Sequence, residues 1–345
     1  MNTGIRQRAR SSLAFGLVLA FVPALAEQSK PTVVGDGFHR HFAEEPHMGV
    51  VVRIEAFVPT GTNPARVFRS AFDRVSALTK VFSSYRDDSE LSDVEQRAWE
   101  SPVRVSPEFA TVLSEALRIA RQSGGAFDPT VGRVTRLLRN RPYDRRGPGE
   151  REISNAWDLT GWRQVTLDSA RRLVFLRMRG LQFDFGGIAK GYIADQVIET
   201  LETEGVSRAI VSVAGDIVAG DPPPGERGWQ VALDATGEPR TVERTLLVRN
   251  QAVSTSGSRE RYHFAGGRRC SHVVTRKSSP CADVRQAVSV VAPTGLEADG
   301  LATALLALGR ARSGPILSAR LEVQAYWAET AAEIPVPAAE ARERR

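Results

Sequence analysis

The stretch from Asp184 to Asp195 constrains the fold most, because it joins an apolar strand to a helix through a pair of glycines. Gly186 and Gly187 precede the helix, and Lys190 lies in its first turn. Glycines let a backbone approach a ligand closely, and the free N–H groups at a helix start favour an anion. The stretch therefore suits a phosphorylated ligand held beside a metal. An ordinary strand-to-helix turn with a solvated lysine explains it equally well, and the spacing is not that of a nucleotide-binding P-loop.

The first 26 residues have the pattern of a secretory signal. Arg6, Arg8 and Arg10 precede an apolar run, and small residues lead up to Ala26, after which we expect cleavage. A membrane anchor is the alternative, but the apolar run is shorter than the ~20 residues that a spanning helix needs. No cysteine follows the small residues, so a lipid anchor is not expected there. The pattern predicts an exported, soluble, periplasmic protein.

The charge of the mature chain argues against a nucleic-acid partner. The 345 residues carry a formal charge of +6, which falls to about +3 when the three arginines of the signal are removed. Basic residues cluster only over 139–146, and such a run is usually a solvated face. A hydrophobic content of 42% is enough for one large core. We expect one unit over 46–329, between a flexible segment (27–45) and a disordered tail (330–345).

The two cysteines, Cys270 and Cys281, stand eleven positions apart. In an oxidising compartment they can form a disulfide, which would stabilise a loop of this length by roughly 2–3 kcal/mol. Two independent buried thiols are the alternative. His272 lies between them, but two cysteines and one histidine are too few for a structural zinc site.

Residue patterns predict both strands and helices. β-branched residues predict a strand over 49–58, and apolar spacing predicts helices from Asn63 onward and over 106–122. We expect a hairpin over 164–176 and an apolar strand over 209–217.

Two loops carry residues suited to a planar ligand. Residues 84–91 are dense in hydroxyls and acids and include Tyr85, although the same residues also suit a helix cap. Phe127 and Asp128 lie on a loop that Pro129 stiffens. They are placed to clamp a ligand, or else Phe127 packs into the core.

Asp299 and Thr303 lie four positions apart in a predicted apolar helix over 298–309, and therefore on one face of it. An ionised carboxylate in such a helix needs a partner. Mg²⁺ held by a carboxylate and a hydroxyl would supply one. An exposed aspartate that offsets the helix dipole is the alternative. The hydroxyls of residues 253–258 suit phosphate contacts or an ordinary turn.

Five separated motifs, in order, resemble the ApbE family of FAD:protein FMN transferases, across roughly 48–309. They are Ser84-Tyr85 with Ser89-Glu90-Leu91, Gly125 to Thr130, Asp184 to Gly191, Ser254 to Gly257 with Ser271-His272, and Ala298 to Thr303. The resemblance implies an α+β fold with a T-fold-related core, in which helices flank a mixed, largely antiparallel sheet. Residues 46–329 would form this flavin transferase domain.

The resemblance also implies an activity: Mg²⁺-dependent transfer of FMN from FAD to a threonine hydroxyl of an exported electron-transfer flavoprotein, with release of AMP. The acceptor would be a subunit of a membrane electron-transfer complex. Gly187, Asp299 and Thr303 would hold Mg²⁺, and His272 would act as acid and base beside Lys190 and Asp299. The implied flavin contacts are Met48, Tyr85, Ala126, Phe127, Asp128, Asp184, Lys190 and Val273.

Two stretches depart from the family pattern. Thr275 to Pro280 replace an Asp-Pro pair, and a strand that usually ends in Gly-Gly-Asp ends in Ala214-Gly215-Asp216. A flavin carrier or assembly factor that holds FAD without transferring it is therefore an alternative, as is an FAD pyrophosphate hydrolase. An oxidoreductase is less favoured, because the cysteines lack Cys-x-x-Cys spacing.

Overall fold

An eight-stranded sheet organises the chain in a computed structural model, which describes residues 33–34, 37–139, 147–233, 244–257, 262–265, 268–271, 273–275 and 286–329. The strand order is β1-β2-β3-β7-β8-β11-β14-β15, and every neighbouring pair is antiparallel. The strands are β1 (Val33–Val34), β2 (Phe38–His47), β3 (Val50–Pro59), β7 (Ala209–Val213), β8 (Asp216–Ala219), β11 (Gln251–Gly257), β14 (Gln286–Ala292) and β15 (Gln324–Glu329). The predicted α+β class with a largely antiparallel sheet is confirmed.

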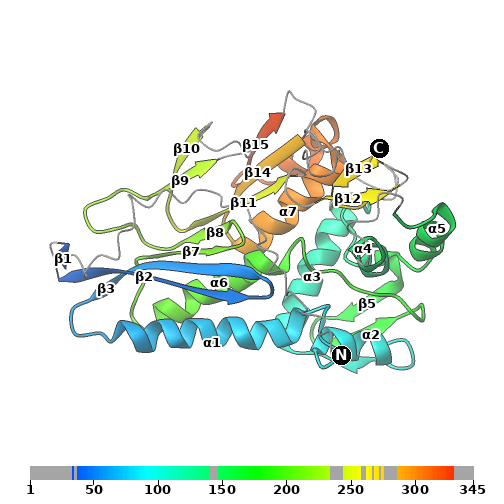
Figure 1. Ribbon diagram of the computed structural model, residues 1–345, viewed down its shortest axis with the longest axis horizontal. Helices are drawn as coiled ribbons and strands as arrows, with labels where there is room; N and C mark the ends of the chain where they lie inside the picture. The colour runs from blue at the N-terminus through cyan, green and yellow to red at the C-terminus, as the bar shows by residue number, and fades with distance from the viewer. Residues whose placement is uncertain are drawn as a thin grey trace, which may run out of the picture.

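Four helices build the main core with this sheet: α1 (Pro64–Phe82), α3 (Pro107–Gln122), α6 (Ala189–Thr203) and α7 (Gly295–Leu308). Figure 1 shows α1 and α6 running along the same side of the sheet. The sequence begins these helices with caps: Asn63 Oδ1 accepts the N–H groups of Ala65 and Arg66 at the start of α1, and the Ser106 hydroxyl accepts that of Phe109 in α3. Both predicted amphipathic helices are confirmed.

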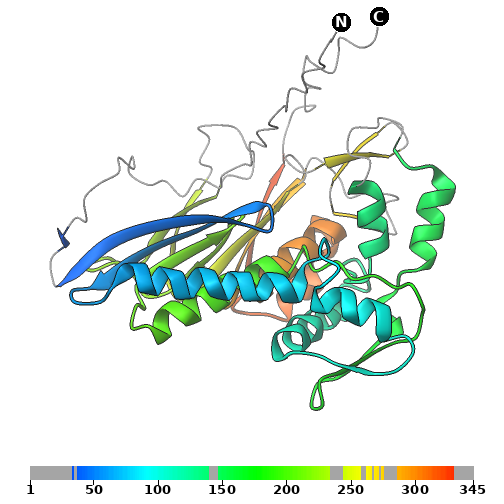
Figure 2. The same cartoon turned by 60° about the horizontal axis from the view of Figure 1, so that its bottom comes forward.

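The opposite face of the sheet is covered by the hairpin of β9 (Trp229–Leu233) and β10 (Arg244–Val248). A three-stranded sheet has the order β4-β6-β5, formed by β4 (Val103–Arg104), β5 (Val165–Asp168) and β6 (Leu173–Leu176), which confirms the predicted hairpin over 164–176. The remaining elements are α2 (Glu90–Arg97), α4 (Gly132–Arg139), α5 (Glu150–Asp158), α8 (Gly314–Ser318), β12 (Tyr262–Ala265), β13 (Arg268–Ser271) and two short 3₁₀ turns, Trp162–Gln164 and Arg310–Arg312. Helices α4 and α5 lie side by side at one end of the molecule, near β12 and β13 (Figure 2).

The prediction of a flexible segment over 27–45 is wrong for residues 38–45, which belong to strand β2. This strand pairs along its full length with β3. Its odd-numbered residues turn toward α1, where His41 meets the edge of Phe68 and His47 stacks on Phe72. Along β2, every second residue faces the core, and histidines occupy several of these positions instead of apolar residues. The sequence of the segment is therefore polar on both faces and does not show the alternation typical of a strand.

The predicted strand over 209–217 is a hairpin instead. Val213 pairs with Asp216, so Ala214 and Gly215 form a two-residue turn between β7 and β8, with φ of 52° and 93°. Positive φ at both positions suits the right-handed twist of a hairpin. The hydroxyl-rich stretch 253–258 is likewise a strand up to Gly257, rather than a turn.

Several predictions concern residues outside the described part of the chain. These are the signal over 1–26, most of the 27–37 stretch, His272, Cys281 and its pairing with Cys270, residues 276–280 and the tail over 330–345. Within the described ranges, no helix has the length and apolar character needed to cross a membrane.

Replacing Ala214 with glycine should stabilise the fold by about 1 kcal/mol, because the Cβ of alanine is strained at positive φ. The free energy of unfolding in urea measures this. Ala219→Gly is the matched control, since Ala219 is 2% exposed in the same hairpin and lies outside the positive-φ region. The control should lose about 1 kcal/mol or more. A less stable Ala214→Gly variant would show that the turn is not strained.

Candidate active site

Lys190 is the centre of a buried ionic cluster formed by α6, α7 and β8. Its ammonium nitrogen lies 2.9 Å from Asp216 Oδ2, 3.0 Å from Asp299 Oδ2 and 3.1 Å from Asp299 Oδ1. It also donates to the Gly186 carbonyl at 2.9 Å. The sequence predicted that Asp299 needs a partner, and in the structure Lys190 is that partner. The alternative of an exposed aspartate is excluded, because Asp299 is 2% exposed.

Two carboxylates share one ammonium in this cluster. Burial raises the pKa of Asp299, and the charge of Asp216 raises it further, although Lys190 and the Gly191 N–H work in the opposite direction. Burial lowers the pKa of Lys190, but the charges of Asp216 and Asp299 outweigh it and the net direction is upward. The lysine is therefore charged, and the cluster retains excess negative charge when both acids are ionised.

Gly187 and Thr303 lie against each other beside this cluster. A Cβ on Gly187 would come within 2.8 Å of Thr303 Oγ1, so a larger residue would fill the space between them. Thr303 Oγ1 is also 3.3 Å from Ser256 Oγ on β11. The described residues contain no cluster of three or more His, Cys, Asp or Glu side chains able to hold a metal. The carboxylate of Asp299, the hydroxyl of Thr303 and nearby backbone carbonyls are oxygen donors, which are the hard ligands that Mg²⁺ prefers.

Asp216 is the member of the cluster that sequence reasoning did not place in the site. It is 4% exposed, and its Oδ1 accepts the hydroxyl of Ser254 on the neighbouring strand. The available signal was an acid next to glycine at the end of an apolar strand, since a buried carboxylate needs partners. Ser254 and Ser256 alternate with Thr255, so the hydroxyl-rich strand turns two of its hydroxyls toward Asp216 and Thr303.

Tyr85 and Asp184, both predicted flavin contacts, are joined through Arg139. Arg139 Nη1 donates to Tyr85 Oη at 2.9 Å, and Nη2 lies 3.6 Å from Asp184 Oδ2. Asp184 Oδ1 accepts the Gly186 N–H at 2.8 Å. This pair is therefore connected to the glycine turn before Lys190.

The loop with Phe127 and Asp128 is tied to its own surroundings. The Phe127 ring is 5% exposed and belongs to the main core, with Ala126 packed against it. Asp128 Oδ1 accepts the Thr130 N–H and hydroxyl, and Oδ2 accepts the Trp162 N–H. Ring and carboxylate thus shape the loop itself, and its Pro129 carbonyl accepts the Asp184 N–H at 2.8 Å.

Met48 and Val273 are the remaining described residues of the predicted set. Met48 has φ of 52° in the turn between β2 and β3 and packs against the main core. Val273 is 7% exposed in the same core.

A family model, curated relatives and solved structures all identify the same family. The family model described as "ApbE family" matches residues 48–327. The chain belongs to the ApbE family. Among curated relatives, the FAD:protein FMN transferase of Haemophilus influenzae is 34% identical over 238 residues, covering 66% of this chain and 68% of its own. That of Treponema pallidum is 31% identical over 290 residues, covering 78% and 79%. The apo crystal structure of the Pseudomonas stutzeri flavinyl transferase ApbE superposes with a TM-score of 0.73 at 26% identity, covering 87% of this chain and 94% of that one.

The structure describes residues in both stretches that depart from the ApbE family pattern, 214–216 and 275–280. Ala214 lies in the turn that leads into Asp216, so a positive-φ alanine stands two positions before a member of the ionic cluster. Thr275, the first residue of the other departing stretch, is 4% exposed.

Asp195 locks the two helices of the site together. From α6, its Oδ1 accepts the Gly295 N–H at 2.6 Å and its Oδ2 accepts the Leu296 N–H at 2.8 Å, at the first turn of α7. The helices touch here, because a Cβ on Gly191 would lie 1.9 Å from the Gly295 carbonyl oxygen. Asp195 therefore fixes how α7, with Asp299, meets α6, with Lys190.

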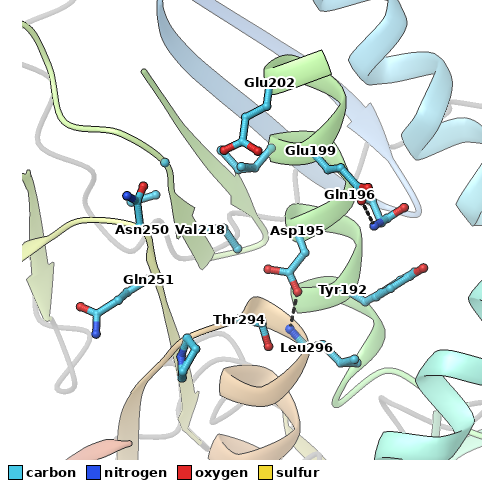
Figure 3. A pocket seen from close by; sticks show the side chains of 14 residues that line it. Tyr192, Asp195, Gln196, Glu199, Glu202, Val218, Asn250, Gln251, Thr294 and Leu296 are labelled. Carbon is cyan, nitrogen blue, oxygen red and sulfur yellow. Dashed lines mark hydrogen bonds between the residues drawn. The ribbon is translucent and has the colours of Figure 1, made fainter. Parts of the chain in front are cut away.

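A cavity of about 390 Å³ lies beside this lock, between α6, β8 and the start of α7. Figure 3 shows Asp195 pointing from α6 toward Leu296, with Glu199 and Glu202 further along the same helix. None of the predicted site residues lines this cavity. Burial raises the pKa of Asp195 to about 6, against the two N–H donors that lower it, and the charge of Glu199 adds to the increase.

The raised pKa of Asp195 predicts a pH-dependent stability. Between its ordinary value of 3.8 and about 6, the folded chain keeps a proton that the unfolded chain has lost, so the free energy of unfolding falls as pH rises. Compared with an Asp195→Asn variant, the unmodified chain should lose about 2–3 kcal/mol of stability between pH ~4 and ~7. Urea unfolding at several pH values measures the difference. Asp73→Asn, which removes one carboxylate at an exposed position of α1, is the control for the loss of an acid in itself. A flat difference for Asp195→Asn itself would contradict the prediction.

Proposed function

We propose that this chain transfers FMN from FAD to a threonine hydroxyl of an exported electron-transfer protein and releases AMP, in a reaction that depends on Mg²⁺. The observation that carries the proposal is the Asp216–Lys190–Asp299 cluster beside Gly187 and Thr303, in a member of a family whose curated relatives are named FAD:protein FMN transferase. The acceptor is proposed to be a subunit of a membrane electron-transfer complex, and both proteins are placed in the periplasm.

The transfer breaks the phosphoanhydride bond of FAD and forms a phosphate ester bond to the acceptor. The threonine oxygen forms a bond to the phosphorus on the FMN side of the pyrophosphate, and the bond from that phosphorus to the bridging oxygen breaks. AMP leaves with the bridging oxygen and its electron pair, and the hydroxyl proton passes to a base. The main demand is stabilisation of the negative charge that builds on the phosphates, together with alignment of the attacking oxygen.

The residues of the cluster meet that demand by holding charge in a fixed position. Lys190 supplies a permanent positive charge, since its two carboxylates raise its pKa. Asp299, Thr303 and the carbonyl of Gly187 would hold Mg²⁺, which would neutralise pyrophosphate oxygens when bound. Asp195 keeps α6 and α7 in register so that these donors stay together.

We assign to His272 the role of the base that accepts the proton of the threonine hydroxyl. This residue lies outside the described part of the chain. Its neighbour Val273 is buried in the main core. An unperturbed imidazole titrates near pH 6.5, which suits removal of a hydroxyl proton near neutral pH.

The mature protein, given FAD, Mg²⁺ and a candidate acceptor domain, should add to one acceptor threonine the mass of one FMN less one water. Intact-protein mass spectrometry measures this, with the threonine-to-alanine acceptor as the control. Release of AMP without any acceptor would indicate the pyrophosphate hydrolase instead, and FAD binding without AMP release would indicate the carrier.

Replacing Asp299 with asparagine should lower the transfer rate by about 10²-fold or more, since it removes a carboxylate that both fixes Lys190 and would bind the metal. A chelator should abolish transfer by the unmodified chain, and Mg²⁺ should restore it. Glu297→Gln is the matched control, because this carboxylate belongs to the same helix but pairs with Arg118 and Arg320. Equal transfer rates for Asp299→Asn and Glu297→Gln would show that Asp299 has no role in the reaction.

A further inference from the structure

Tyr85 presents an aromatic ring to solvent that is 77% exposed, an unusual degree of exposure for a side chain fixed by defined contacts. It lies in the short connection between α1 and α2, where Ser83 Oγ accepts its backbone N–H at 3.3 Å. An exposed ring that is held in place offers a flat apolar face to a planar ligand.

Arg139 is what holds this ring. Its guanidinium carbon lies 5.0 Å from the centre of the Tyr85 ring, and Nη1 donates to the phenol oxygen at 2.9 Å. The guanidinium is itself fixed to the preceding turn of α4, since Nε donates to the Thr135 carbonyl at 3.3 Å and Nη2 to the Thr135 hydroxyl at 3.4 Å. One group thus supports both the ring and the hydroxyl of Tyr85.

The same helix is anchored to the segment that leads into the ionic cluster. At the start of α4, Gly132 donates its N–H to the Gln182 carbonyl at 3.0 Å, and a Cβ there would lie 2.4 Å from the Phe183 carbonyl oxygen. At its end, Arg139 lies 3.6 Å from Asp184. Asp184 then holds the N–H of Gly186, whose carbonyl accepts from Lys190. A chain of contacts therefore runs from the Tyr85 ring to the Lys190 ammonium.

We propose that Arg139 is a positioning residue for the flavin end of FAD: it holds Tyr85 as a stacking surface at a fixed place relative to Lys190. This inference rests on the proposed function, since it assumes that FAD occupies the site. Arg139 covers part of the ring with a planar group and leaves the rest open to the isoalloxazine. A lysine could supply the charge, but not the planar fork that supports ring and hydroxyl together.

The test is FAD affinity, measured by titration with flavin fluorescence as the readout. Arg139→Gln should weaken FAD binding about tenfold, because it removes a charge-assisted hydrogen bond and the ring contact. Arg139→Lys should recover less than half of this loss. In a Tyr85→Ala background, Arg139→Gln should change the affinity by less than about twofold, since two residues that act through one contact are not additive. Fully additive effects would overturn the proposal.

Two further measurements separate this role from others. ADP carries the pyrophosphate but no flavin ring, so Arg139→Gln should leave ADP binding unchanged; an equal loss for ADP and FAD would mean that Arg139 contacts phosphate instead. Arg179→Gln is the matched control, because Arg179 also lies over an aromatic ring, that of Trp99, at 4.5 Å. It should bind FAD like the unmodified chain, and thermal unfolding should show both variants folded.

The outcomes also separate this inference from the proposed function. If the unmodified chain binds FAD and Arg139→Gln binds it equally well, the positioning role is wrong, and the proposed function is unaffected because the transfer assay tests it separately. If the unmodified chain binds no FAD, both fail together.

Discussion

The pairing of one partly buried lysine with two buried aspartates is the interaction on which the rest of the site depends. Lys190, Asp216 and Asp299 come from α6, β8 and α7, so three elements must meet correctly before any one of these charges is compensated. An unpaired charge at this depth costs several kcal/mol, and loss of one partner leaves the others uncompensated. The cluster therefore favours one arrangement of the three elements.

Glycine makes this arrangement sterically possible. A Cβ at Gly191 or Gly295 would lie within 2.3 Å of a backbone carbonyl oxygen on the other helix, and one at Gly187 would meet Thr303. The glycines that first indicated a phosphate loop thus have a second use, which is to let α6 and α7 approach each other closely enough for Asp195 to cap α7. The stretch 184–195 therefore combines a turn that can face a ligand with a close contact between two helices. A local sequence pattern does not show which of these two purposes a glycine serves.

Local patterns predicted the four long helices α1, α3, α6 and α7 and part of the strands, because caps such as Asn63 and Ser106 and apolar spacing are read within a few residues. Contacts distant in sequence were harder to predict. Strand β2 was missed because histidines occupy its apolar positions, and Asp216 because its partners Ser254 and Lys190 are 38 and 26 positions away. The apolar helix around Asp299 predicts that this carboxylate needs a partner, but the sequence offers Lys190 as a flavin contact and does not pair it with Asp299. Burial dictates that a partner exists, and only the tertiary fold decides which one.

The charge balance of the cluster gives a physical reason for the proposed divalent cation. With both acids ionised, two negative charges face one ammonium, and burial together with the charge of Asp216 raises the pKa of Asp299. A pyrophosphate brings further negative charge, so the cluster alone would repel it. A divalent cation on Asp299 and the neighbouring oxygens would reverse the sign of the local charge and leave Lys190 balanced by Asp216. Asp299 stabilises the fold through its ion pair with Lys190, and it would bind the substrate through the metal. Folding and activity would therefore both depend on this carboxylate.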